Sequence, residues 1–250
     1  MTQQLKDQTV VIFGGSSGMG KGAAIAARNA GAKVWIVGRD ADRLRAAAEE
    51  IAPGQADTVQ TSSVDAFDEA AVAAFFEAIP QGSIHHLVLT IGAGAGCSSL
   101  LGKDGAAGLR KQFDLKFFAQ TTPISYGAEK IADGGSIVVT SGALSRRPGK
   151  GSTALAAANA ALEAIVKGLA NDLGPRLRVN CVSPGLTNTE MWANMPAERR
   201  EGMLAGFGKT LPLGRAGESS DVGLAIAMLL QASYTTGATL DCDGGATIRP

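Results

Sequence analysis

The chain of 250 residues carries 23 basic and 23 acidic side chains, so its formal net charge is zero. A general binder of nucleic acid or of membrane surfaces needs a basic field, and neither partner is expected here. Hydrophobic residues make up 45% of the chain, which favours a globular protein with a substantial core.

The N-terminal stretch MTQQLKDQTV has neither the basic nor the apolar region of a signal peptide, and no uncharged apolar run is long enough for a membrane span. The cysteines Cys97, Cys181 and Cys242 are far apart and form no CxxC pair. With His85 and His86 as the available histidines, neither a metal site nor a disulfide framework is expected. These features predict a cytoplasmic protein with free thiols.

Short β-rich runs alternate with longer amphipathic stretches along the chain. The predicted strands are TVVIF (9–13), KVWIV (33–37), DTVQ (57–60), HHLVLT (85–90), SIVVT (136–140), RVNCV (178–182) and ATLDC (238–242). Several are apolar at consecutive positions, as in strands that are covered on both faces. The alternation predicts one doubly wound α/β domain of Rossmann type over residues 1–250, with a parallel sheet and helices on both faces.

A glycine-rich turn, GGSSGMG, joins the first predicted strand to the first helix. Gly14 allows a tight turn, Gly18 allows a diphosphate to approach the backbone, and Gly20 allows the helix to pack on the strand. The helix N-terminus offers free N–H groups to an anion. The turn therefore predicts a dinucleotide site, with further contacts from the same loop: Ser16, Ser17 and Met19.

The second predicted strand ends in GRD, where an NAD site usually carries an acidic residue for the ribose 2′-hydroxyl. Gly38 leaves room and Arg39 supplies a planar cation that suits a 2′-phosphate. Asp40 is interpreted as the cap of the following helix. The sequence therefore favours NADP(H) over NAD(H).

A long segment between the sixth and seventh predicted strands departs from the alternation of strands and helices. This segment is rich in apolar side chains: Met191, Trp192, Met195, Met203, Leu204 and Phe207. Long loops next to the carboxyl edge of such a sheet are often lids, and we predict a substrate lid at about residues 188–212 for a hydrophobic small molecule. The alternative, that these residues cover the core or an interface, stays open.

The chain resembles the classical short-chain dehydrogenase/reductase family over essentially its full length. The resemblance rests on GGSSGMG, on LTIG (89–92) at the family's NNAG position, on RVNCVSPGLTNT (178–189) at its NxxSPGxxxT segment, and on LPLGRAGESSDVGLAIAMLL and TTGATLDCDGG near the C-terminus. It implies a seven-stranded sheet, a homotetramer or homodimer, and further cofactor contacts: Ser63, Val64, Thr90, Ile91, Gly92, Pro184, Gly185, Thr187 and Thr189.

The resemblance also implies a catalytic tetrad of Asn, Ser, Tyr and Lys, and this chain lacks all four. The Asn position is Lys116, the Ser position is Gly142, the Tyr position is Leu155 and the Lys position is Asn159. The Asn and Lys have exchanged places, because Lys116 precedes Asn159. In the family fold these two positions face each other across the cofactor's ribose.

We therefore hypothesise that Lys116 supplies the cation, and the acid, from the opposite helix, while Asn159 binds a ribose hydroxyl. Ser141, next to the missing Ser, is a second catalytic candidate. Two alternatives stay open: Lys116 pointing into solvent, and Ser141 acting as a turn residue.

Three functions are compatible with these residues. The first is an NADP(H)-dependent reductase of an iminium or another pre-activated acceptor, whose product needs no protein acid. The second is a carbonyl reductase that uses Lys116 or Ser141. The third is an NADP(H)-binding protein without redox turnover, either a cofactor sensor or a template for a cyclisation.

Overall fold

The computed structural model describes residues 5–92 and 99–248, so Cys97 lies outside the described residues. Seven parallel strands form the main sheet in the order β3-β2-β1-β4-β5-β6-β9. Their bounds are β1 (Thr9–Phe13), β2 (Lys33–Gly38), β3 (Gln60–Ser63), β4 (Ile84–Leu89), β5 (Ile131–Thr140), β6 (Arg178–Pro184) and β9 (Thr239–Cys242). The predicted doubly wound parallel sheet is confirmed.

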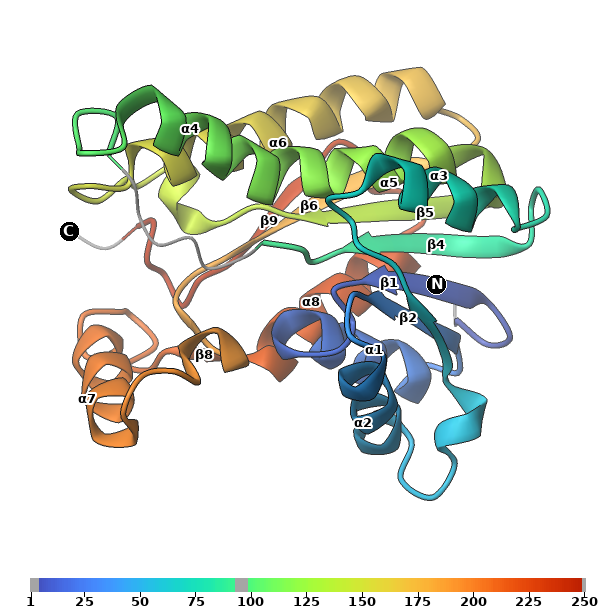
Figure 1. Ribbon diagram of the computed structural model, residues 1–250, viewed down its shortest axis with the longest axis horizontal. Helices are drawn as coiled ribbons and strands as arrows, with labels where there is room; N and C mark the ends of the chain where they lie inside the picture. The colour runs from blue at the N-terminus through green and yellow to red at the C-terminus, as the bar shows by residue number, and fades with distance from the viewer. Residues whose placement is uncertain (1–4, 93–98, 249–250) are drawn as a thin grey trace.

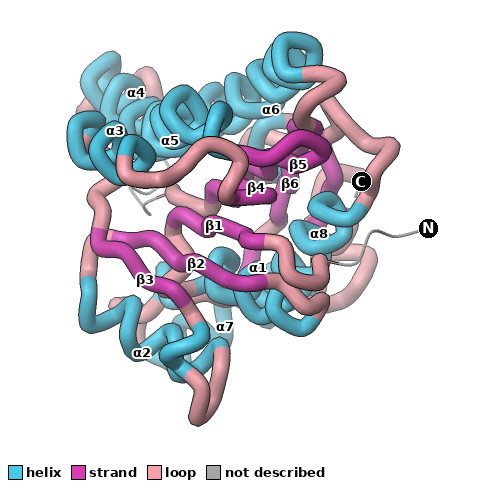
Figure 2. Tube along the Cα trace, turned by 90° about the vertical axis from the view of Figure 1, so that its right-hand side faces the viewer, coloured by secondary structure: helices cyan, strands magenta, loops and turns pink. Residues whose placement is uncertain are grey.

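Helices cover both faces of this sheet, as the end-on view in Figure 2 shows. One face carries α1 (Gly18–Asn29), α2 (Ala41–Ile51) and α8 (Ser219–Gln231). The other carries α3 (Glu69–Glu77), α4 (Gly105–Phe113), α5 (Ala119–Gly127) and α6 (Thr153–Leu173). Asp40 caps α2, because its side chain accepts hydrogen bonds from the backbone N–H groups of Asp42 and Arg43.

The sheet divides the core into two clusters, and alternate residues of each central strand belong to opposite clusters. On β1, Val10 and Ile12 pack under α1 and α8, whereas Val11 and Phe13 pack under α3 and α5. All four are at most 1% exposed. Burying such a side chain stabilises the fold by about 1.5–3 kcal/mol, which explains why the run is apolar without alternation.

The third strand was predicted three residues too early. Residues Ala56–Thr58 form a 3₁₀ turn, η1, and β3 begins at Gln60. Val59 turns into the core at 5% exposure between the two. Because β3 is an edge strand that pairs only with β2, its QTSS side chains are polar and mostly exposed. Apolar patterning therefore does not mark it.

A continuous helical stretch joins α4 to α5 through a π-helical turn, η2 (Asp114–Phe118). The stretch then passes through a 3₁₀ turn, η3 (Ala128–Lys130), into β5. Single π turns inside helices occur often at functional sites, and this one carries Lys116.

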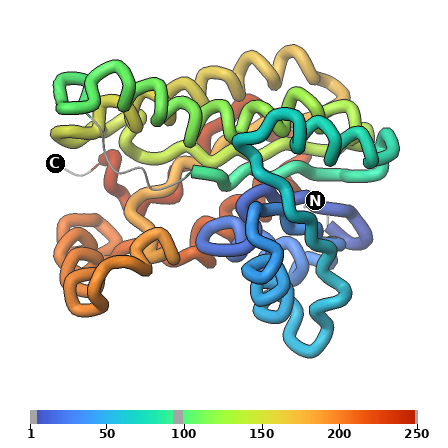
Figure 3. Tube along the Cα trace, viewed as in Figure 1, coloured from blue at the N-terminus to red at the C-terminus, as the bar shows by residue number. Residues whose placement is uncertain are grey.

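The predicted lid lies at one corner of the molecule, beyond the carboxyl edge of the sheet (Figure 3). It contains η5 (Glu190–Trp192) and α7 (Ala197–Gly208). A small two-stranded sheet of β7 (Thr187–Asn188) and β8 (Gly217–Glu218) holds its two ends together. The remaining 3₁₀ turn, η4 (Ala143–Ser145), follows β5.

By length and composition α6 is the one helix in the described part of the chain that could cross a membrane. It also contains Glu163 and Lys167, and it packs against β6 as a helix of the fold. Its apolar window is 28% buried in this structure.

A buried histidine joins β4 to β1 and β5. His86 is 1% exposed; its Nε2 lies 2.7 Å from the Gln8 side-chain oxygen and its Nδ1 2.8 Å from the Ser136 hydroxyl. Because the Gln8 oxygen accepts, Nε2 carries the proton and Nδ1 accepts from Ser136. Burial, followed by the charges of Arg178 and His85, lowers the pKa of His86 to about 3.

This burial predicts a pH dependence of stability. Below pH 6.5 the unfolded chain protonates residue 86 while the folded chain does not, so stability present above that pH is lost on acidification. We expect the free energy of unfolding to fall by about 1.5 kcal/mol between pH 6.5 and pH 5 on account of His86. Urea denaturation of His86→Gln should lack this component, and the neighbouring His85→Gln should retain it. If the free energy of unfolding of His86→Gln falls between pH 6.5 and pH 5 as much as that of the wild type, the assignment to His86 is wrong.

Candidate functional site

A cleft of about 790 Å³ opens at the carboxyl ends of β1, β2, β3 and β4. The predicted cofactor residues that line it are Gly14, Ser16, Ser17, Gly18, Met19, Gly20, Arg39, Val64, Thr90, Ile91, Gly92 and Thr189. Ligands of doubly wound sheets bind at this edge, where neighbouring connections leave toward opposite faces.

The glycine-rich turn forms the centre of the cleft. Gly14 has φ +82° and Gly18 has φ +49°, the left-handed region in which glycine is favoured. A Cβ on Gly20 would overlap the carbonyl oxygen of Gly14, so this position has no room for a side chain. The turn thus places the first N–H groups of α1 at the cleft.

Two arginines stand at the end of the cleft near β2. Arg39 and Arg43 both line it, and the Arg39 guanidinium lies 5.4 Å from the centre of the Phe67 ring. Ser63 does not line the cleft, but its hydroxyl donates to the Arg39 carbonyl oxygen at 2.9 Å and braces the backbone there. The two guanidinium groups make this end of the cleft suit an anion, although the Asp40 carboxylate also lines it.

Lys116 is buried behind the cleft wall, with 8% of its surface exposed. A Cβ built on Gly92, which lines the cleft, would lie 3.1 Å from the Lys116 Nζ. Burial lowers the pKa of Lys116 to about 8, opposed weakly by Cys181. The alternative that Lys116 points into solvent is therefore wrong, while its catalytic role stays a prediction.

Asn159 lies on α6 next to Gly142, and a Cβ on Gly142 would be 2.9 Å from the Asn159 Nδ2. A side chain at 142 would have to displace this amide. Asn159 is 3% exposed, and its Oδ1 is buried without a hydrogen-bond partner among the described residues. A buried acceptor of this kind calls for a donor, such as a hydroxyl of a bound ligand. Leu155, one turn earlier on α6, is half-buried.

Ser141, the residue before Gly142, belongs to a polar cluster around Glu163. Its hydroxyl donates to Glu163 Oε1 at 2.9 Å, and the Ser145 hydroxyl donates to the same oxygen at 2.6 Å. Arg146 approaches this oxygen at 3.4 Å and also pairs with Asp241 at 2.5 Å. The Ser141 proton is thus directed at Glu163.

The predicted contacts that follow β6 lie in two places. Thr189 lines the cleft, whereas Pro184, Gly185 and Thr187 do not. Thr187 is 5% exposed and its hydroxyl donates to the Gly185 carbonyl oxygen at 3.1 Å. The backbone here is fixed by β7 and by the Trp192 indole N–H, which donates to the Thr187 carbonyl oxygen.

The structure adds residues to this site that the sequence reasoning missed. The lining residues that were not predicted are Phe13, Val37, Arg43, Asp65, Ala66, Phe67 and Glu190. The cleft also includes Gly38, Asp40 and Met191, which the sequence analysis assigned to the 2′-phosphate end, the helix cap and the lid. Arg43 was detectable, because it follows Arg39 by four residues across the start of a capped helix. Glu190 was not, because the contact of its carboxylate with the Gly18 N–H spans 172 positions.

Gln120 on α5 was also missed. It is fully buried; its Nε2 donates to the carbonyl oxygens of Ile91 at 2.8 Å and Thr140 at 2.9 Å, and its Oε1 accepts from the Thr140 N–H. One side chain therefore holds the ends of β4 and β5 beside Gly92 and Ser141. Among residues 5–92 and 99–248, no group of three or more His, Cys, Asp or Glu residues could hold a metal ion.

The described residues fit a phosphorylated dinucleotide. A Cβ on Gly20 would overlap the turn and a Cβ on Gly18 would crowd Thr189. The arginines lie at the β2 end of the cleft, and the unpartnered Asn159 oxygen lies next to Gly142. Residues 14–247 match the family described as enoyl-(acyl carrier protein) reductase.

Similar proteins include the short-chain dehydrogenase/reductase ATR9 of Stachybotrys chlorohalonatus, 32% identical over 98% of this chain and 99% of the relative. A small-chain dehydrogenase solved in complex with NADPH is 33% identical, with a TM-score of 0.79 over 97% of this chain and 100% of that chain. An NADPH-bound short-chain oxidoreductase from Pseudomonas aeruginosa, described as containing an atypical catalytic center, is 29% identical, with a TM-score of 0.85 over 98% and 100%. The chain belongs to the short-chain dehydrogenase/reductase family of oxidoreductases.

Proposed function

We propose that this protein is an NADP(H)-dependent reductase with a non-standard active site, acting on an imine, iminium or carbonyl group of a hydrophobic small molecule. The observation that carries the proposal is the cleft, in which a glycine cradle and two arginines lie in front of the buried Lys116 amine. Assembly into a homodimer or homotetramer belongs to the same proposal and is checked by light scattering.

The preference for NADP(H) rests on the charges at the β2 end of the cleft. Arg39 and Arg43 face it, and the Asp40 carboxylate accepts two backbone N–H groups of α2. A guanidinium pairs well with a 2′-phosphate, whereas an NAD site usually carries an acidic residue directly at the end of β2, where this chain has Gly38. That two similar proteins have been solved with NADPH supports the same preference.

This preference predicts the effect of removing one arginine. Arg39→Ala should weaken NADPH binding about 10- to 100-fold and leave NADH binding nearly unchanged, because a charge-assisted contact to the phosphate is worth about 1.5–3 kcal/mol. The measurement is calorimetric titration with both nucleotides. Arg45→Ala, on the exposed face of α2 outside the cleft, is the matched control. Equal losses for NADPH and NADH would contradict the proposed 2′-phosphate contact.

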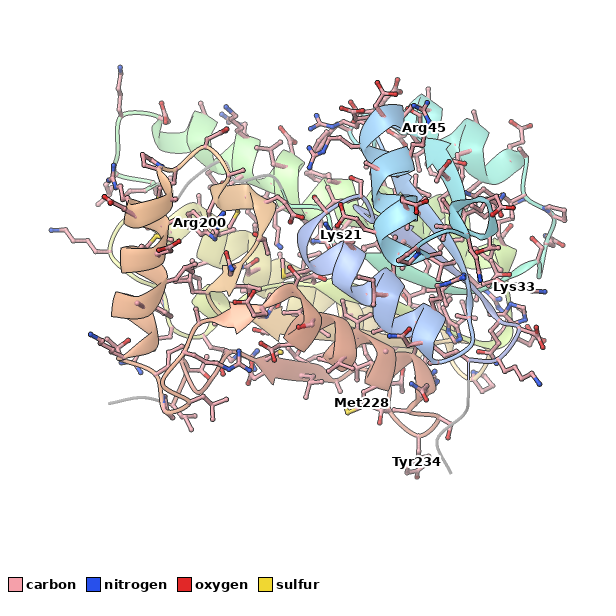
Figure 4. The ribbon with its side chains drawn as sticks, turned by 90° about the horizontal axis from the view of Figure 1, so that it is seen from below. Lys21, Lys33, Arg45, Arg200, Met228 and Tyr234 are labelled. Carbon is pink, nitrogen blue, oxygen red and sulfur yellow. The ribbon has the colours of Figure 1, made fainter. Side chains whose placement is uncertain are left out.

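NADPH would supply a hydride, and the remaining chemistry falls to the side chains of the chain. Neither tyrosine is a proton donor in the cleft: Tyr126 donates to Glu69, and Tyr234 extends away from the molecule (Figure 4). Lys116 lies against the cleft wall at Gly92, and a pKa of about 8 leaves it mostly protonated at neutral pH. It can therefore donate a proton to the oxygen of a carbonyl group whose carbon accepts the hydride, or hold positive charge next to the ligand.

An iminium acceptor, which a cyclic imine becomes when it takes up a proton, needs less help from this lysine. Hydride addition to an iminium gives a neutral amine, so no oxyanion has to be protonated. The test is loss of nicotinamide absorbance with panels of cyclic imines and ketones. Turnover of imines alone assigns the first substrate class, and turnover of ketones assigns the second.

The role of Lys116 predicts a defined variant phenotype. Lys116→Met should lower turnover about 10²- to 10⁴-fold on a ketone, or weaken NADPH binding if the substrate is an imine. The exposed Lys111→Met on α4 is the control. The protein should remain folded, since methionine replaces a buried amine with an apolar chain of similar length. Unchanged turnover together with unchanged NADPH affinity would contradict the proposed role of Lys116.

The same lysine predicts a pH profile. Because the protonated amine is the acid, ketone reduction should fall as pH rises through about 8, the pKa of Lys116. The residual ketone reduction by Lys116→Met should not fall over this pH range. If the variant shows the same fall in activity, another group titrates there.

A second candidate function, NADP(H) binding without redox turnover, is favoured by the Ser141 contact. The Ser141 hydroxyl proton is directed at Glu163, and Leu155 offers no proton at all. A cofactor sensor or a template for a cyclisation would suit such a site. Tight NADPH binding with no turnover on either panel would support this reading over the reductase.

A further inference from the structure

The N-terminus of α1 lacks a cap from its own segment. The Ser17 side chain makes no capping hydrogen bond, and the first turn of the helix contains no acidic residue. The first N–H groups of a helix carry partial positive charge and attract an anion. In this structure the anion comes from the lid, because the Gly18 N–H donates to Glu190 Oε2 at 2.6 Å.

A second contact holds the same carboxylate. Lys21 Nζ lies 2.9 Å from Glu190 Oε1, and on its other side it pairs with Glu50 Oε2 of α2 at 2.6 Å. Lys21 stands at the end of α1 nearest to α7 in the view of Figure 4, and its side chain is 18% exposed. Although burial alone raises it, the pKa of Glu190 is lowered on balance by Lys21 and by the Gly18 N–H. The carboxylate is therefore charged at neutral pH.

Glu190 also lines the cleft, beside the glycine turn that would hold the diphosphate. The neighbouring Thr189 is packed on the same turn, since a Cβ on Gly18 would lie 3.2 Å from the Thr189 Cβ. A charged carboxylate and a diphosphate repel each other at such a short separation in a partly buried site. The two cannot share the Gly18 N–H.

We propose that Glu190 is an internal competitor of the cofactor, a lid carboxylate that occupies the diphosphate position at the start of α1 and must leave when the dinucleotide binds. The proposal rests on the proposed function, because it assumes that the cleft binds NADP(H). Glu190 begins η5, so its departure moves the first turn of the lid. The cofactor's affinity is thereby set partly by the lid.

The test is calorimetric titration of Glu190→Gln with two ligands, NADP⁺ and adenosine 2′-monophosphate. The variant keeps the size of the side chain and removes its charge. We expect about tenfold tighter binding of NADP⁺, the size of effect that follows from about 1.4 kcal/mol of relieved repulsion. Binding of adenosine 2′-monophosphate should not change, because this fragment carries the 2′-phosphate and lacks the diphosphate.

Glu50→Gln is the matched control. It removes the same charge from the same lysine, but Glu50 does not line the cleft. The proposal expects less than about a twofold change in NADP⁺ affinity for this variant. Glu190→Ala provides a second uncharged variant, and it should show at least the gain of Glu190→Gln. Thermal unfolding of all three variants checks that they are folded.

The outcomes separate this proposal from the proposed function. If NADP⁺ binds wild type and Glu190→Gln equally, Glu190 is not a competitor, and the proposed function stands. Equal gains for both ligands, or an equal gain in Glu50→Gln, would assign the effect to net charge and overturn the proposal. If NADP⁺ binds none of the proteins, both proposals fail together.

Discussion

The close packing of α1 is the constraint on which the rest of the site depends. A Cβ on Gly20 would overlap the Gly14 carbonyl oxygen of the turn, and a Cβ on Gly22 would overlap the Ser219 carbonyl oxygen at the start of α8. From the other side, a Cβ on Gly223 would overlap the Gly22 carbonyl oxygen. The backbone of α1 is thus held directly against the turn and against α8. This packing places the first N–H groups of the helix at the cleft, and a side chain at any of these positions would displace the helix.

Around this fixed helix, the site is built from charges that arrive on separate elements. Arg39 comes from the turn after β2, Arg43 from α2, Lys116 from a π turn between α4 and α5, and Glu190 from η5. Burial makes the lysine a weaker base than usual, because the uncharged amine is favoured where water is excluded. The glutamate responds in the opposite sense, because Lys21 and the Gly18 N–H stabilise its charge. Lys116, behind the cleft wall, is therefore a cation of reduced pKa, whereas Glu190, which lines the cleft, is an anion of reduced pKa.

Hydrogen bonds from buried side chains fix the ends of the central strands relative to each other. Gln120 joins the ends of β4 and β5, so Gly92 and Ser141 are fixed relative to each other. Glu163 gathers the hydroxyls of Ser141 and Ser145 behind the same strand end. Each bond is worth only about 1 kcal/mol, but a buried polar atom left without its partner costs more than that. The polar groups around the cleft consequently tolerate few local rearrangements.

The sequence by itself determined the doubly wound sheet, the glycine-rich turn and the cap at Asp40, because each depends on residues close together in the chain. Uninterrupted apolar runs specify strands buried on both faces, and three glycines at a strand–helix junction specify a backbone that a diphosphate can approach. The polar edge strand β3 was placed wrongly for the same reason, since it carries no apolar signal. Only the tertiary structure decided that Lys116 is buried, that Ser141 turns to Glu163, and that Glu190 reaches Gly18. These outcomes depend on which distant elements pack together, and burial and pairing then set the charge and the direction of each group.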